Sequence, residues 1–212
     1  MKKQMFAAAA RRYDFLNTVI SLGLHKSWRR WCVRRLGIGG LRCLDLASGT
    51  GDFALELLKG GAESVVCADF CPEMLDIARR KIGEGATFVE CPAEELPFED
   101  DSFDIITVGF GVRNFEDGKK CYREMRRVLK PGGRLCVLEI TGGGGLFGVY
   151  FNRIMPHIGN FVSGTKAYKY LAESVERFDT PEEMVEKLAA AGFRTREIKK
   201  FVLGGVTALV CV

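Results

Sequence analysis

Short apolar runs alternate with segments of helical period along the first two-thirds of the chain, and this alternation predicts strands separated by helices. Pro72 stands at a favourable first helical position, and Pro131-Gly132-Gly133 predicts a sharp end to the third helix. Such strand–helix units are typical of an α/β fold with a parallel sheet covered by helices. The predicted strands are Arg42 to Leu46, Ser64 to Asp69, Ala86 to Glu90, Phe103 to Phe110 and Arg134 to Ile140, and the predicted helices are Phe53 to Leu58, Pro72 to Ile82 and Lys119 to Leu129.

The end of the chain has a different pattern. Arg194 to Leu203 and Val206 to Val212 are two strand-like runs joined at Gly204-Gly205, which predicts a hairpin. A parallel sheet that finishes in an antiparallel hairpin resembles the seven-stranded, Rossmann-like methyltransferase sheet, in which the last strand is inserted beside strand five. A nicotinamide-binding domain does not ordinarily end this way.

Length and composition favour a single domain. The 212 residues, 47% of them hydrophobic, are enough to fill one core, so we expect a single domain over 1–212. The resemblance to the methyltransferase sheet implies that it is a methyltransferase domain with an N-terminal helical cap at 1–40 and an acceptor-side insertion at 142–170. The apolar run Met5 to Ala10 is shorter than the core of a signal peptide, and no run approaches the roughly 18 to 20 apolar residues of a membrane-spanning helix. We therefore expect a cytoplasmic protein.

Metal and nucleic acid are not expected ligands. The eight cysteines include no C-x-x-C pair, and Cys43, Cys67, Cys136 and Cys211 fall in strand-like runs that favour burial. The net charge of +4 comes with no RNA-binding motif. Positive charge is concentrated in HKSWRRWCVRRL at His25 to Leu36, a predicted helix whose cationic face either is simply solvated or contacts an acidic membrane surface.

The segment CLDLASGTGDFA contains Gly49-x-Gly51-x-x-Ala54, a weak signal for a dinucleotide loop when taken alone. Asp69, at the end of the second strand, is placed to accept the hydroxyls of a ribose, or alternatively to cap the helix that begins at Pro72. Asp52 is expected at a helix N-cap, where a pyrophosphate would need the helix end free of anions. Asp45 and Asp52 therefore suit the ammonium and sulfonium groups of S-adenosylmethionine better than the phosphates of NAD.

The chain resembles the ubiquinone/menaquinone biosynthesis C-methyltransferases, which use S-adenosylmethionine, from about Met5 to its end. Of the shared segments, LPFEDDSFD and LKPGG occur in many small-molecule methyltransferases, whereas YDFLN, HKSW and FGVRN are more specific. The full set is YDFLNTVISLGLHKSW at Tyr13 to Trp28, LDLASGTGD at Leu44 to Asp52, AEELPFEDDSFD at Ala93 to Asp104, FGVRNF at Phe110 to Phe115, RVLKPGGRLCVLE at Arg127 to Glu139 and YKYLAESV at Tyr168 to Val175.

The resemblance implies a cofactor site in which Thr50 and Asp69 contact S-adenosylmethionine, Pro92 and Ala93 lie beside the adenine, and Gly109 lies near the methionine end. Asp45, Gly49 and Gly51 complete this predicted set. Pro92 stands where relatives more often have Asp or Asn, and Gly109 replaces a more usual Ser. After strand five, the usual EFS is replaced by Glu139-Ile140-Thr141 and the glycines Gly142 to Gly145.

The implied reaction is methylation of a ring carbon of a reduced polyprenylated quinol, most simply demethylmenaquinol. Arg113 and Asn114 follow strand four, where a cation can favour the phenolate or orient a water, and Tyr13 is a further catalytic candidate; His25 is expected on a helix surface. Arg113 has the alternative of a structural ion pair with Glu116 or Asp117.

Other readings remain open: another hydrophobic acceptor such as a sterol, phospholipid or polyketide, a non-catalytic cofactor-binding protein, or an NAD-dependent oxidoreductase. The apolar segment Gly142 to Tyr170 either forms an acceptor gate at the membrane or fills a core of its own.

Overall fold

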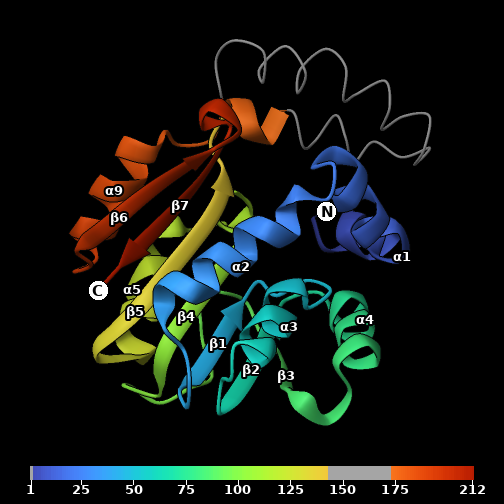
Figure 1. The fold of residues 1–212 in the computed structure, drawn as a ribbon, viewed down its shortest axis with the longest axis horizontal. Coiled ribbons are helices and arrows are strands. Elements are labelled where there is room, and N and C mark those ends of the chain that lie inside the picture. The colour runs from blue at the N-terminus through green and yellow to red at the C-terminus, as the bar shows by residue number, and fades with distance from the viewer. Residues whose placement is uncertain (1, 143–172) are drawn as a thin grey trace.

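The computed structural model describes residues 2–142 and 173–212 of the chain. A seven-stranded sheet runs through the molecule in the order β3-β2-β1-β4-β5-β7-β6 (Figure 1). The strands are β1 (Arg42–Leu46), β2 (Ser64–Asp69), β3 (Thr87–Glu90), β4 (Phe103–Gly109), β5 (Leu129–Ile140), β6 (Thr195–Phe201) and β7 (Val206–Cys211). The helices are α1 (Lys2–Ile20), α2 (Leu24–Leu36), α3 (Asp52–Lys59), α4 (Pro72–Ile82), α5 (Gly118–Val128) and α9 (Pro181–Ala190), and a short 3-10 turn, η2 (Val112–Asn114), follows β4.

Strands β1 to β5 are parallel, whereas β7 pairs antiparallel with both β5 and β6. The last strand of the chain therefore lies beside strand five, which confirms the predicted fold class and hairpin. The chain winds outward from β1 to β3 and then crosses to β4. This reversal makes the carboxyl ends of β1 and β4 the switch point where open α/β sheets bind ligands.

Helices cover both faces of the sheet. On one face, α2 and α3 bury Trp28, Leu36, Phe53 and Leu57 against the strands. On the other, α5 and α9 contribute the buried Tyr122, Met125, Met184 and Leu188. The amphipathic helix α5 places Lys119, Lys120 and Arg123 in solvent and its apolar side chains in this core.

The start of β5 and the N-cap of α3 differ from the prediction. Helix α5 ends at Val128, and β5 begins at Leu129 and continues through Pro131 to Gly133, so the strand is longer at its start than predicted. Leu129 is buried opposite Phe103, and Lys130 pairs with Asp104 at 2.8 Å, which holds this segment extended against β4. The N-cap of α3 is Gly51, with a positive φ of 81°, and Asp52 is the first helical residue.

Helices α1 and α2 form the N-terminal part of the fold. Helix α1 packs on α4, where Ala10 joins Cys71 and Met74 in a small apolar cluster. None of the helices over 2–142 and 173–212 is long and apolar enough to cross a bilayer. Apart from Gly142, the predicted acceptor-side insertion lies outside the described residues.

Candidate functional site

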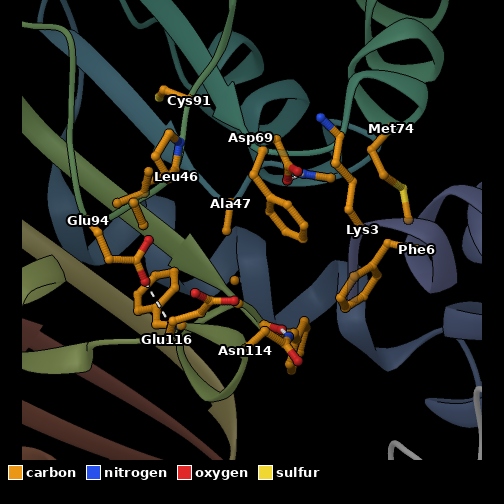
Figure 2. A pocket seen from close by; sticks show the side chains of 18 of the residues that line it. Lys3, Phe6, Leu46, Ala47, Asp69, Met74, Cys91, Glu94, Asn114 and Glu116 are labelled. Atoms are coloured by element: carbon orange, nitrogen blue, oxygen red, sulfur yellow. Dashed lines mark hydrogen bonds between the residues drawn. The ribbon is translucent and has the colours of Figure 1, made fainter. Parts of the chain in front are cut away.

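A cavity of about 310 Å³ opens at the carboxyl ends of β1, β2 and β4, at the switch point of the sheet. Figure 2 shows Lys3 and Phe6, from α1, on one side of it, with Leu46 and Glu94 on the other. Five of the eight predicted cofactor-binding residues line this cavity: Gly49, Asp69, Pro92, Ala93 and Gly109. Its walls are largely apolar, which suits a flat heterocyclic ligand.

Asp69 supplies a buried carboxylate at this cavity. One oxygen accepts a hydrogen bond from the backbone N–H of Gly49 at 2.8 Å, and the other accepts from Cys71 at 2.9 Å. Burial raises the pKa of Asp69, while these backbone donors counteract the rise. The N-cap of α4 is Cys71 and receives no side-chain cap, so Asp69 joins the glycine loop to the start of α4 without serving as the N-cap.

Asp45, Thr50 and Gly51 are not among the residues that line the cavity. Asp45 is buried behind it, where it accepts hydrogen bonds from Thr107 Oγ1 at 2.9 Å and the Ala54 N–H at 3.0 Å, and burial raises its pKa to about 7. The Thr50 hydroxyl donates to Asp14 of α1. A Cβ on Gly51 would lie 2.7 Å from Ile82, so close packing on α4 as well as the positive φ requires glycine there.

The glycine at position 109 has a packing explanation. A Cβ built there would meet the ring of Phe53 at 2.8 Å, so a serine would require Phe53 to move. The other departure, Pro92, lines the cavity next to Ala93 and Glu94, and it offers no side-chain acceptor. The carboxylates of Glu94 and Glu116 lie at the same end of the cavity (Figure 2).

A second, smaller cavity of about 50 Å³ adjoins the first, and Tyr13 and Phe110 line both. Its other walls come from α1, α2 and the end of β5, and they include Asn17, Trp28 and Ile140. Burial raises the pKa of Tyr13, and the nearby Arg113 and Arg29 oppose that rise. The two predicted catalytic residues Tyr13 and Arg113 therefore meet at this second cavity, while Asn114 lines the first.

Arg113 is held by a partner that the sequence did not reveal. Its Nη1 donates to Glu139, a fully buried carboxylate on β5, and to the carbonyl of Phe110 at 3.0 Å. Burial raises the pKa of Glu139, and the Arg113 charge opposes this rise. The predicted alternative of a pair with Glu116 or Asp117 is not what forms; Asp117 instead caps α5. Arg113 Nε is buried without a hydrogen-bond partner.

The expected surface position of His25 was wrong. The ring is 2% exposed, and its Nδ1 accepts from Arg29 Nη1 at 2.7 Å, which requires that nitrogen to be unprotonated. Burial and the Arg29 charge lower the pKa of His25 to about 4. The burial of Arg29 also removes one cation from the expected cationic face of α2, because the inner side of this helix packs on the sheet.

All eight cysteines are free and buried, in agreement with the expected burial. Within the described part of the chain, no group of three or more His, Cys, Asp or Glu side chains is arranged to hold a metal ion.

Comparison with known proteins identifies the family. The model of the ubiE/COQ5 methyltransferase family matches residues 2–211. This chain belongs to the ubiE/COQ5 methyltransferase family. A demethylmenaquinone methyltransferase of Deinococcus radiodurans is 47% identical over 205 residues, covering 92% of this chain and 85% of the relative. One of Thermus thermophilus is 50% identical over 204 residues, covering 91% of this chain and 92% of the relative.

The fold agrees with this family membership. A crystal structure of an S-adenosylmethionine-dependent methyltransferase from Aquifex aeolicus superposes with a TM-score of 0.67 at 18% identity, covering 86% of this chain and 88% of the other. The ubiE/COQ5 membership confirms the resemblance drawn from YDFLN, HKSW and FGVRN, and it excludes the oxidoreductase alternative.

Proposed function

We propose that this protein transfers a methyl group from S-adenosylmethionine to a ring carbon of a polyprenylated quinol, most simply demethylmenaquinol. The observation that carries the proposal is the pair of adjoining cavities that share Tyr13 and Phe110, with Asp69 in one and Arg113 in the other. Both relatives cited above are named for the menaquinone reaction, which favours a naphthoquinol over a benzoquinol.

The residues of the larger cavity fit S-adenosylmethionine. Asp69 offers a carboxylate for the ribose hydroxyls, and Leu46, Phe70, Pro92 and Ala93 offer apolar contacts for the adenine ring. Asp45 and Asp52 were expected to attract the cofactor cation directly, but both are engaged elsewhere: Asp45 with Thr107, and Asp52 with Lys81 at 2.9 Å. In this proposal they attract the cofactor cation through the electrostatic field of the loop and do not contact it.

The chemistry requires an activated acceptor carbon. Bound S-adenosylmethionine supplies an electrophilic methyl group, and a ring carbon becomes a good nucleophile when a neighbouring hydroxyl loses its proton. Arg113, fixed by Glu139 at the wall of the smaller cavity, stabilises that phenolate. Once the methyl group has passed from sulfur to the ring carbon, that carbon must lose its hydrogen as a proton to restore aromaticity. Arginine stays protonated and does not accept this proton, so a water oriented at this wall is the proposed proton acceptor. Tyr13 and Asn114 position the ring.

A long prenyl chain confines the acceptor to a bilayer, so we propose that the enzyme collects it at a membrane surface. Segment 142–170 remains the proposed acceptor gate, although only Gly142 of it lies among the described residues. The cationic surface of α2 is smaller than expected, but Lys26 and Arg34 are exposed and can contact anionic lipid.

The test is methyl transfer from labelled S-adenosylmethionine to a short-chain and a long-chain demethylmenaquinol and to demethylated benzoquinol precursors, with product identification. We expect the naphthoquinols to be methylated on carbon. Transfer only to sterols, phospholipids or polyketides would replace the proposed acceptor, and binding of the cofactor without any transfer would indicate a non-catalytic protein.

A further inference from the structure

Phe110 lies at the end of β4 between two glycines, and its ring lies where the two cavities adjoin. Among the described residues, Tyr13 and Phe110 are the ones that line both cavities. The glycines at 109 and 111 add no side chain, and packing opposes one: a Cβ on Gly111 would lie 2.6 Å from the Cβ of Ala47. The aromatic ring is therefore the one side chain that this tripeptide contributes to the cavities.

The backbone of Phe110 is held in an unfavourable conformation. Its φ is 60°, in the left-handed region that a bulky non-glycine residue rarely adopts. The N–H donates to the carbonyl of Leu138 at 2.7 Å, and the carbonyl accepts from Nη1 of Arg113 at 3.0 Å, so hydrogen bonds fix this conformation from both sides. Glycine would adopt it without strain, and strain of this kind is typical of functional sites. The strained phenylalanine is therefore a candidate for a functional role.

Contacts with α2 fix the ring and leave part of it open to the cavities. The ring lies edge-to-face with Trp28, with centroids 6.4 Å apart and planes at 63°. The guanidinium of Arg29 lies 5.1 Å from the ring centre and covers one face. Phe110 is nevertheless only partly buried, because the rest of its surface faces the two cavities. A fixed aromatic surface at this place can contact a flat ring.

We infer that the ring of Phe110 binds the aromatic ring of the acceptor and holds its reacting carbon beside the sulfonium methyl. The inference rests on the proposed function. Methyl transfer brings the sulfur-bound methyl and the acceptor carbon into contact, and this contact forms where the cavities adjoin. Aromatic rings attract one another in offset-stacked or edge-to-face arrangements, which the saturated rings of a sterol and the headgroup of a phospholipid do not offer. Phe110 therefore favours a flat, aromatic acceptor over these alternatives.

The experiment removes the ring and measures acceptor and cofactor binding separately. Phe110→Leu keeps an apolar side chain but loses the aromatic face, so KM for a short-chain demethylmenaquinol should rise about three- to tenfold. Calorimetric affinity for S-adenosylhomocysteine should stay parental, because the proposed ribose and adenine contacts come from other strand ends. Phe110→Tyr keeps the ring and should keep the parental KM. Phe201→Leu is the matched control, because Phe201 also packs on Trp28, at 5.9 Å between centroids, but lines neither cavity.

A folded Phe110→Leu variant with a parental KM would overturn the inference. A loss of S-adenosylhomocysteine affinity as large as the rise in KM would also overturn it, since the ring would then serve the cofactor. An equal rise in KM in Phe201→Leu would do the same, because it would indicate a general effect of the aromatic cluster around Trp28. If Phe110→Leu does not fold, Phe110→Met, whose unbranched side chain adapts to irregular spaces, replaces it with the same expected results. A parent protein that binds S-adenosylhomocysteine but methylates no quinol would instead contradict the proposed function.

Discussion

At the scale of single residues, the proposed contact of Asp69 with the ribose can be tested directly. Its carboxylate is held at the cavity by the N–H groups of Gly49 and Cys71. Asp69→Asn should weaken S-adenosylhomocysteine by about ten- to hundredfold, because a charge-assisted bond to the ribose is lost. Asp76→Asn alters an exposed acid paired with Arg79 on the same α4 helix, and calorimetry should find its affinity normal. Normal affinity in a folded Asp69→Asn variant would contradict the ribose role.

Asp45 should make the ligand-free protein less stable as pH rises. Burial raises its pKa to about 7 from an ordinary value of 3.8, so the folded state binds more protons than the unfolded state between these values. Stability contributed by the protonated form is complete below pH of about 4 and is lost as pH rises toward 7. Asp45→Asn keeps a neutral partner for Thr107 and Ala54 and should remove this dependence. Urea unfolding of both proteins from pH 4 to 8 measures it, and parallel pH profiles would contradict the expectation.

Substitutions of Arg113 and of its partner Glu139 should have opposite effects on the ionisation of the acceptor phenol. Arg113→Met removes the cation that favours the phenolate, so turnover should fall on the order of a hundredfold while S-adenosylhomocysteine still binds normally. Glu139→Gln keeps an acceptor for Arg113 but removes its counter-charge. The more positive wall should lower the pKa of the acceptor phenol and shift the acidic limb of the pH–rate profile to lower pH.

These two variants also separate catalysis from packing. A buried arginine without its counter-charge costs stability, so each variant is first compared with the parent by thermal unfolding. A folded Glu139→Gln variant whose pH–rate profile is unshifted would show that Glu139 only packs against Arg113. Near-normal turnover in Arg113→Met would require another residue to stabilise the phenolate.

At the scale of elements, α1 is attached to the cofactor loop through one side chain. Asp14 accepts hydrogen bonds from the Thr50 hydroxyl and from Lys81 of α4, the latter at 2.6 Å. Asp14→Ala should therefore loosen α1, seen as faster hydrogen exchange along this helix and reduced cofactor affinity. Gln4→Ala is the control, since Gln4 is exposed on the same helix and does not line the cavity. Equal exchange rates in both variants would mean that apolar packing alone holds α1.

Elements whose signal lies in local sequence were predictable. Three elements have the predicted bounds: the strands Arg42–Leu46 and Ser64–Asp69 and the helix Pro72–Ile82. Their signals, an apolar run or a proline at a helix start, depend only on residues that are close in sequence. The start of β5 was missed because Leu129 is extended by its contact with β4, a long-range cause. The partner of Arg113 was missed for the same reason: Glu139 reaches it only through the register of β4 with β5. Sequence therefore located the site at the strand ends, while pairings across the sheet required the structure.

At the scale of the whole molecule, strained turns hold apolar side chains in solvent. Leu22, between α1 and α2, is 78% exposed with a φ of 50°, and Leu203, between β6 and β7, is 81% exposed with a φ of 54°. Left-handed backbone costs a non-glycine residue about 1–2 kcal/mol. The elements joined by these turns also form the walls of the smaller cavity, through Ile20 and Ser21 on one side and Val206 on the other. Exposed leucines near the proposed acceptor cavity suit a surface that enters the headgroup region of a bilayer.

This arrangement allows membrane binding to be separated from folding. Leu22→Gly/Leu203→Gly relieves the backbone strain, so its free energy of unfolding should equal or exceed that of the parent by about 1 kcal/mol. Flotation with phosphatidylglycerol vesicles should nevertheless show weaker binding, because two apolar side chains no longer enter the lipid. Ile198→Gly, at an exposed position within β6, is the control and should float like the parent.

With a short-chain quinol dispersed in detergent, the double variant should keep parental turnover, whereas a long-chain quinol embedded in vesicles should be methylated more slowly. Unchanged flotation, or equal loss of turnover on both quinols, would contradict a lipid contact at these two turns, and a parent protein that does not float would contradict the proposed membrane association.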